Sequence, residues 1–184
     1  MGNLLVTMQR LTGDALQQAY REGQRQFSQR DMTAIHLFQA NLRGIDLEES
    51  CLAQAYLPYC NFTLANLKGV NFSEAQLGDS NFYGANLDGA HCTQADFSRT
   101  DLQTANLQGC DLRGANLSGA DLRQADLTDA NLEGCTLVGA RLEGAILHGA
   151  NLRQCNLFRA VGVDLTDSCC DDTTILPTGY NYGR

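Results

Sequence analysis

Three histidines and eight cysteines are the side chains of this sequence best suited to chemistry. A histidine can act as a general acid or base, and a cysteine as a nucleophile or a metal ligand. His36, His91 and His148 lie far apart in the sequence, and no cysteine pair or Cys/His cluster has the spacing of a zinc site. Any catalytic or metal centre would therefore depend on how the fold brings these residues together.

Carboxylates and glycines also recur, but their spacing is regular rather than clustered. Asp or Asn appears every fifth residue over long stretches, as at Asp101, Asn106, Asp111 and Asn116. Paired carboxylates can perform acid-base catalysis, yet here each carboxylate follows from the repeat. The glycines follow the same five-residue period and form no phosphate-binding loop. The element that positions all these groups is the repeat itself.

The repeat is centred on a Leu or Phe that recurs every five residues from Phe27 to Leu157. Only Met32 and Cys92 depart from Leu or Phe at the centre. A small residue lies two positions before most centres, Asn or Asp lies one position before, and Gly is common at the last position. The unit is therefore A-(D/N)-L-x-x, and it continues without an insertion.

A five-residue period excludes an amphipathic helix and requires corners. A helix turns about 100° per residue, so successive centres would point to every side. In a strand the small residue and the centre two positions later share one face, whereas the next centre would point the other way. All centres are buried only if the chain turns a corner once per repeat, and Gly, Asn and Asp favour such turns. The pattern predicts a coiled tube with Leu and Ala inside.

The tandem pattern, for example ANLQGCDLRGANLSGADLRQADLTDANLEG, resembles the pentapeptide-repeat family, and most of all its cyanobacterial members. The resemblance implies an all-β solenoid, a right-handed quadrilateral β-helix with four repeats per coil. With 20 residues per coil, Phe62 and Phe82 stack on one side, and the three histidines fall on three different sides. A tightly filled β-helix offers no pocket. We therefore expect no enzyme activity, no catalytic residue, no cofactor and no metal.

Both ends of the repeat should differ from its middle, because an open coil exposes backbone and apolar side chains. We expect an N-terminal segment, 1–26, with a short capping α-helix that begins at Thr12, buries Leu16, Ala19 and Tyr20, and ends at Gly23. The uninterrupted β-helix covers 27–160. Residues 161–184 form a final partial coil, with Leu165, Cys170 and Ile175 as its centres, and an irregular tail from residue 178.

Five cysteines fall inside the predicted tube and are expected to behave as small apolar residues. Cys60, Cys110, Cys135 and Cys155 occupy the small inward position, and Cys92 is a centre. Cys135 and Cys155 would lie in adjacent coils, close enough for a disulfide, although a reducing cytosol argues against one. Whether that pair, or the vicinal pair Cys169 and Cys170, is ever oxidised stays open.

The net charge of −8 argues against a nucleic-acid-binding surface, because phosphate contacts need clustered Lys and Arg. No stretch approaches the roughly 20 apolar residues needed to span a bilayer, and the N-terminus lacks the apolar core of a secretory signal. We expect a cytoplasmic protein that binds neither nucleic acid nor membrane. A monomer is favoured over a dimer.

Two exposed surfaces are candidates for contact with another protein. The first is the most acidic side of the tube, and its carboxylates are Asp46, Glu48, Glu49, Asp88, Asp126 and Asp129, against Lys68 alone. The second is an aromatic cluster, Phe38, Tyr56 and Tyr59, near the N-terminal end of another side. The N-terminal helix could instead cover these aromatic side chains.

Two functions remain open, with a third much less favoured. The first is a non-enzymatic protein-interaction or regulatory scaffold, whose partner is another protein. The alternative is a DNA mimic that binds DNA gyrase or another DNA-binding protein, as the resemblance implies for some members. A duplex as long as the tube, roughly 35 Å from the strand spacing, carries about 20 charges, more than twice the net charge of this chain. An enzyme would need a pocket between the N-terminal segment and the first coil.

Overall fold

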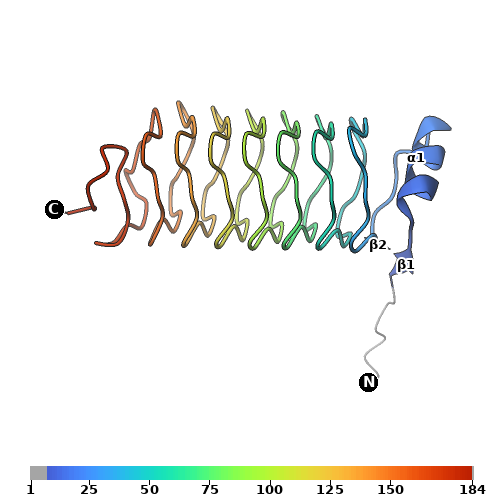
Figure 1. Cartoon of the computed structure of the whole chain (residues 1–184), viewed down its shortest axis with the longest axis horizontal. Helices are drawn as coiled ribbons and strands as arrows, with labels where there is room; N and C mark the ends of the chain where they lie inside the picture. The colour runs from blue at the N-terminus through green and yellow to red at the C-terminus, as the bar shows by residue number, and fades with distance from the viewer. Residues whose placement is uncertain (1–7, 184) are drawn as a thin grey trace, which may run out of the picture.

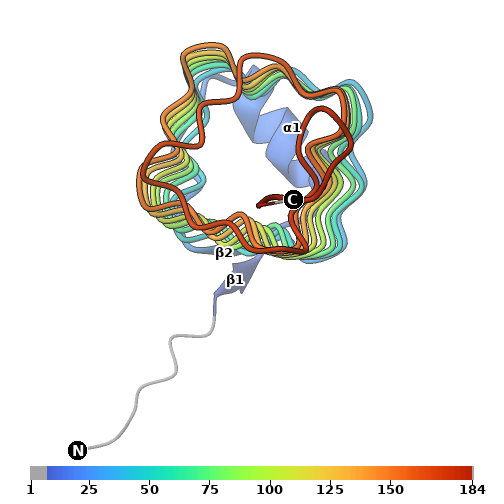
Figure 2. The ribbon, with the colours of Figure 1, turned by 90° about the vertical axis from the view of Figure 1, so that its left-hand side faces the viewer.

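The computed structural model describes residues 8–183 and shows a long coiled tube (Figure 1). The first seven residues, on which part of the argument about a secretory signal rests, and Arg184 lie outside the described residues. None of the helices in the described part has the length and hydrophobicity to cross a membrane. Seen along its axis, the tube has a roughly square outline (Figure 2).

Each coil contains 20 residues and has four places where it pairs with the next coil. Parallel bridges join the residues before the centres, for example Asn86 to Asn106 and Asn106 to Asp126. At each bridge the backbone N–H of the centre donates to the next coil, and the N–H of the residue before the centre donates to the previous coil. Leu107 N–H, for example, donates to Asp126 O at 2.7 Å, and Asn106 N–H donates to Ala85 O at 3.0 Å. We number the sides by their centres: Leu47 on side 1, Leu52 on side 2, Leu57 on side 3 and Phe62 on side 4.

The core is a column of centres and small residues that are almost completely buried. Phe62 and Phe82 are stacked with their ring centroids 5.1 Å apart, as the 20-residue period predicts. Phe72 comes from side 2 and meets both rings edge-on, at 6.2 and 6.3 Å. Side chains from different sides therefore fill the tube and leave little room for a central cavity.

The Asn or Asp before each centre closes a local turn. Its Oδ1 accepts a hydrogen bond from the backbone N–H two residues later, as between Asn61 and Thr63 at 3.0 Å, and between Asp126 and Thr128 at 3.0 Å. The following corner is closed by a backbone bond such as Ala105 N–H to Leu102 O at 3.1 Å. This geometry explains why the repeat prefers Asn and Asp, whose short side chains form such turns.

Helix α1, Gly13–Arg21, lies across the N-terminal end of the tube (Figures 1 and 2). Thr12 is its N-cap, with Oγ1 accepting from Ala15 N–H at 3.3 Å, and Gly23 follows the end of the helix with φ of +98°. Leu16 is fully buried against the core, while Ala19 and Tyr20 are partly buried.

Two short strands precede and follow the helix and pair in parallel. Strand β1 is Gln9–Arg10 and strand β2 is Arg30–Asp31, with Gln9 opposite Arg30 and Arg10 opposite Asp31. Leu11 N–H extends this pairing to Asp31 O at 2.8 Å. The segment before α1 therefore adds to the edge of the first coil.

The C-terminal end departs from the 20-residue period. Cys169 pairs with Asn151 and Ile175 pairs with Asn156, so these bridges span 18 and 19 residues. Ile175 therefore holds a bridge position, and the expectation that it is a centre is wrong by one residue. The tail expected to be irregular instead folds back, because Ile175 forms an antiparallel bridge to Asn181 and Leu176 N–H reaches Tyr180 O at 2.8 Å.

Candidate interaction surface

The acidic residues expected on one side do lie on side 1, but they form two groups rather than one continuous surface. Asp46, Glu48 and Glu49 lie near the N-terminal end, whereas Asp126 and Asp129 lie 80 residues, or four coils, further along. Four coils correspond to about 19 Å at the usual strand spacing. The intervening positions on this side are mostly amides and glycines, so the two groups would meet different parts of a partner.

One ion pair offsets part of the charge on this side, and hydrogen bonds from neutral groups hold several of its other carboxylates. Asp88 Oδ2 lies 2.8 Å from Lys68 Nζ. Asn66 Nδ2 donates to Asp46 Oδ1 at 3.1 Å and to Glu48 Oε2 at 3.3 Å. Partial burial alone would raise the pKa of Asp126, but bonds from Thr128 and Gln108 outweigh it and hold that pKa below its usual value. Most of the carboxylates on this side are thus engaged within the protein.

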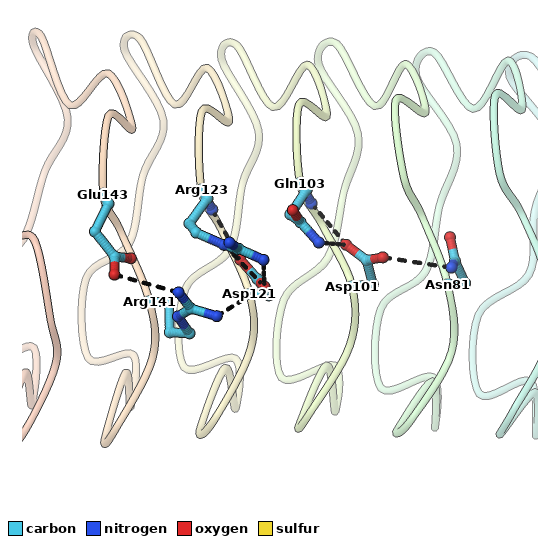
Figure 3. Close-up of polar contacts among 7 residues, drawn as sticks. All are labelled: Asn81, Asp101, Gln103, Asp121, Arg123, Arg141 and Glu143. Atoms are coloured by element: carbon cyan, nitrogen blue, oxygen red, sulfur yellow. Dashed lines mark hydrogen bonds and ion pairs between the residues drawn. The ribbon is translucent and has the colours of Figure 1, made fainter.

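Side 4 carries the most extensive network of charged side chains (Figure 3). Asp121 pairs with Arg123 at 2.6 Å and with Arg141 at 3.7 Å, and Arg141 reaches Glu143 at 3.5 Å. The adjoining Asp101 accepts a bond from Gln103 at 3.1 Å. The hydrogen bonds from Arg123 hold the pKa of Asp121 below its usual value. These opposite charges neutralise one another. Side 4 therefore carries a row of ion pairs along the tube and no set of side chains that converge on one point, as catalysis would need.

The histidines and cysteines are not brought together for chemistry. His36, His91 and His148 occupy bridge or flanking positions on sides 3, 2 and 1. Within residues 8–183, no group of three or more His, Cys, Asp or Glu could hold a metal ion. Both Cys135 and Cys155 are free thiols, each donating at 2.7 Å to the carbonyl oxygen of a centre one coil earlier. The bond to Cys135 and burial raise the pKa of Cys155.

The aromatic cluster lies on side 3 and remains open to solvent. Phe38 and Tyr59 are 56% and 52% exposed, so α1 does not cover them. Their rings meet edge-on with centroids 5.6 Å apart. His36 and Tyr56 form a second ring pair beside them, also 5.6 Å apart, and Tyr56 is only partly exposed. The structure therefore brings together all three aromatic residues that the sequence singled out.

The backbone beneath this cluster departs from the regular repeat. In three successive coils, side 3 has His36, Tyr56 and Gln76 where most repeats have Asn or Asp. The turn that an Asn or Asp side chain closes is therefore missing there. The corner after Leu57 also lacks its own backbone bond. Ser80, one coil further on, replaces it: its Oγ accepts from Cys60 N–H at 2.9 Å and donates to Leu57 O at 2.8 Å.

Tyr59 occupies the corner position of its repeat, where the backbone is left-handed throughout the tube. Its φ is +58°, and the next corner holds Leu64 at +57°, also with its side chain exposed. Glycine adopts this left-handed region at little cost, whereas other residues lose roughly 1 to 2 kcal/mol there. A bulky apolar residue at such a corner does not serve the corner, and its exposure points to a role outside the fold.

Comparison with known proteins decides the family. The family model described as pentapeptide repeats matches the sequence in eight copies, over residues 52–84, 80–119, 105–144 and 125–161. These segments cover more than half of the chain. The chain belongs to the pentapeptide-repeat family. Members of this family are generally non-catalytic.

Several solved structures of pentapeptide-repeat proteins resemble the chain. HetL, involved in heterocyst differentiation regulation in the cyanobacterium Nostoc sp. strain PCC 7120, is 27% identical over 94% of this chain and 100% of its own, with a TM-score of 0.49. The protein alr5209 from Nostoc PCC 7120 is 28% identical over 90% and 99%, with a TM-score of 0.35. A trypsin-treated form of QnrB1, a plasmid-mediated fluoroquinolone resistance protein, is 17% identical over 90% and 91%, with a TM-score of 0.56.

The likeness to QnrB1 concerns the fold alone, and together with family membership it makes the tube a right-handed β-helix. The relatives among solved structures include cyanobacterial proteins, as the sequence indicated. No curated protein matches the chain.

Within the pentapeptide-repeat pattern, sequence reasoning missed two features near the aromatic cluster. Leu64 and Tyr83 are exposed on side 4, where Leu64 lies against Gly84. The sequence feature that could have revealed them is Leu64, which occupies a repeat position that usually holds Gly or a polar residue. A hollow between α1 and the first coil, flanked by Arg21 and Arg25, was also missed as a binding feature. It depends on how the helix sits against the coil, which the repeat does not encode.

Proposed function

We propose that this chain is a non-enzymatic protein-interaction or regulatory scaffold that acts as a monomer and contacts its partner mainly through the aromatic cluster on side 3. The exposed Phe38–Tyr59 pair on an irregular stretch of an otherwise regular tube carries the proposal. Aromatic side chains are enriched at protein interfaces because they bury a large area with few rotatable bonds.

We also infer that α1 acts as a cap. Leu16 is buried on the end of the hydrophobic column, and Tyr20 donates from its hydroxyl to Arg43 O at 2.8 Å, which ties the helix to the first coil. An uncovered coil end would expose apolar side chains and unpaired backbone groups to other chains. The helix would thus keep the scaffold monomeric at this end and leave its sides free for the partner.

The DNA-mimic alternative has weaker support. A mimic needs closely spaced uncompensated charges, yet Asp79, Asp111 and Asp121 form ion pairs with Arg99, Arg113 and Arg123. The side-1 carboxylates form two groups separated by about four coils. Ion pairs of this kind lower the net negative potential along the tube, which is the property that such mimicry requires.

Site-specific photocrosslinking tests the scaffold proposal. A photoreactive amino acid at Tyr59 should capture a defined partner from lysate of the source cell, and the same amino acid at Gln124, on side 4, should not. Phe38→Ser in the Tyr59 probe protein should abolish capture. Reversal of Glu48 and Glu49 to Lys, on the opposite side of the tube, should leave capture from Tyr59 unchanged. Equal capture from Tyr59 and Gln124, or capture that is insensitive to Phe38→Ser, would show that the aromatic cluster is not the contact surface.

A further inference from the structure

A hollow lies between α1 and the coil that faces it, with a volume of about 520 Å³. Tyr20, Arg21 and Arg25 flank it from the helix side, and Phe38, Gln39 and Asn41 from the coil side. The hydrogen bond from Tyr20 to Arg43 O and the buried Leu16 fix the helix against the coil. The walls of the hollow are therefore held in place before any ligand binds.

Two guanidinium groups in this hollow have only neutral partners. Arg25 Nη1 donates to Tyr20 O at 2.8 Å and Gln24 O at 2.9 Å, and its guanidinium carbon lies 3.8 Å from the Tyr20 ring centroid. Arg21 donates to the Gln17 side chain at 3.0 Å. Among the residues that the structure describes, no carboxylate lies within 4.0 Å of either group, and the lining of the hollow contains no Asp or Glu.

This arrangement contrasts with the cations of the middle coils, between residues 68 and 141. Lys68, Arg99, Arg113, Arg123 and Arg141 all pair with carboxylates of the chain. A guanidinium recognises a carboxylate through two parallel hydrogen bonds, so an unpaired and ordered Arg is a ready partner for an acidic group. The negative charge of the whole chain, −8, would repel an acidic ligand elsewhere and direct it to this end.

An apolar contact continues directly from the hollow. Phe38 lines the hollow and also packs edge-on against Tyr59, so the basic wall and the aromatic cluster share one residue. A ligand that crosses both needs an acidic part next to an apolar part. A single small anion would use the arginines and leave the exposed rings without a contact.

We propose that the hollow and the aromatic cluster form one binding site for an acidic peptide segment of a partner protein that carries an aromatic or large aliphatic side chain. The inference rests on the proposed scaffold function and states the chemistry of the partner. Arg21 and Arg25 bind the carboxylates of the segment, and Phe38 with Tyr59 packs against its apolar side chain.

Fluorescence anisotropy with the full chain tests the site. The probe is a short fluorescein-labelled peptide of glutamates that contains phenylalanine, and its counterparts replace the glutamates by lysines or the phenylalanines by serines. We expect the first peptide to bind, the lysine peptide not to bind, and the serine peptide to bind about tenfold more weakly. Arg21→Glu with Arg25→Glu, and separately Phe38→Ser, should each weaken binding of the first peptide by about tenfold or more.

The C-terminal end offers a matched control. Arg153 and Arg159 also lack an ion pair within the described residues, and the guanidinium carbon of Arg159 lies 5.0 Å from the Phe158 ring centroid. Arg153→Glu with Arg159→Glu should leave peptide binding unchanged, although it alters the net charge by the same amount. Because Arg25 also holds Tyr20, Arg21→Glu alone serves as a second variant, and circular dichroism checks that the fold is kept.

The inference is overturned if the glutamate peptide does not bind, or if the lysine peptide binds equally tightly. It is also overturned if Arg153→Glu with Arg159→Glu weakens binding as much as Arg21→Glu with Arg25→Glu does. Each of these results leaves the scaffold proposal standing when crosslinking from Tyr59 still captures a partner that depends on Phe38. Loss of that crosslinking together with intact peptide binding would remove the scaffold proposal and leave a peptide site without an assigned role.

Discussion

At the scale of single residues, the small inward position determines how the corners are satisfied. Most coils have Ala at this position. The corner that it faces in the previous coil is then closed by a backbone hydrogen bond within that corner. Ser50 and Ser80 follow the corners after Phe27 and Leu57, which lack that backbone bond, and each hydroxyl both accepts and donates. These two serines are therefore structural substitutes for a missing turn bond.

Ser80→Ala tests this role. The change leaves Cys60 N–H and Leu57 O without partners in a buried setting, so we expect the free energy of unfolding to fall by about 2 kcal/mol. Ser118→Ala removes only one long contact, 3.5 Å to Thr136, and should cost much less. Urea unfolding of both variants measures the difference. Equal losses would mean that the Leu57 corner does not depend on Ser80.

Buried thiols predict a loss of stability at alkaline pH. Burial raises the pKa of Cys60 to about 11 and that of Cys110 to about 12. An unfolded thiol titrates near 8.5, so the unfolded state releases protons first as the pH rises above that value. The stability contributed by the protonated thiols is complete below about pH 8.5 and is lost as the pH rises toward 11 or 12.

Cys110→Ala isolates one of these thiols. Ala is the usual residue at this position, and Leu87 O keeps its bond from Ala90 N–H at 2.9 Å, so the variant should fold. We expect its melting temperature to fall less steeply between about pH 8.5 and 11 than that of the wild type. Cys169→Ala, at an exposed position, should follow the wild type. Parallel curves for all three proteins would rule out a contribution from Cys110.

At the scale of elements, the corners and the ends carry what is irregular in this chain. The five-residue period was sufficient to predict the tube and its inward residues, whereas the stacked pair Phe62 and Phe82 followed from the 20-residue coil that the family resemblance implied. It could not predict that Phe38 and Tyr59 stay uncovered, because this depends on where α1 rests. The hollow beside Arg21 and the offset of Ile175 follow from end packing, which has no period in the sequence.

Gly162 marks the element where the regular register ends, and Gly162→Ala tests how tightly it is packed. Its φ is +72°, and an added Cβ would lie 2.5 Å from Glu143 Cγ and 2.7 Å from the Glu143 backbone nitrogen. Gly139 has φ of +67° with nothing within 4 Å of such a Cβ. Both variants carry strain of about 1 kcal/mol.

Gly162→Ala must also displace the Glu143 backbone, so we expect a total loss of about 3 kcal/mol, against about 1 kcal/mol for Gly139→Ala. Thermal unfolding of the two variants is the measurement. If Gly139→Ala is the more damaging change, the close approach of the final partial coil to Glu143 is refuted.

At the scale of the whole molecule, the chain distributes charge unevenly, and this limits both its partners and its pH range. Carboxylates along the tube are mostly paired or hydrogen-bonded, whereas Arg21 and Arg25 near α1 have only neutral partners among the described residues. The tube is thus a rigid and largely self-neutralised support, with two arginines that have neutral partners and an aromatic cluster at one end. Such a molecule suits selective binding at one end better than imitation of a uniform polyanion.

The same ion pairs make the whole tube sensitive to acid. Hydrogen bonds from Arg99, Arg113 and Arg123 hold the pKa values of Asp79, Asp111 and Asp121 below their usual range. A lowered pKa in the folded state means that the stability is present above the unfolded value, about 3.9, and is lost as the pH falls through the folded pKa. Together with the thiols, this predicts greatest stability between about pH 4 and 8.5.

Asp121→Asn separates the ion pair from the turn, because Asn serves as well as Asp at this position of the repeat. Asn keeps an oxygen for Arg123 N–H, which Asp121 binds at 3.2 Å, but it cannot titrate. We expect the variant to be less stable than the wild type by under about 1 kcal/mol near pH 7, and the difference to vanish as the pH falls from about 4 to 2. Asp172→Asn, at an exposed position without an ion pair in the described structure, should show no such convergence. Melting curves across this range decide the matter: a constant difference between wild type and Asp121→Asn would mean that the ion pairs on side 4 do not set the acid limit of the tube.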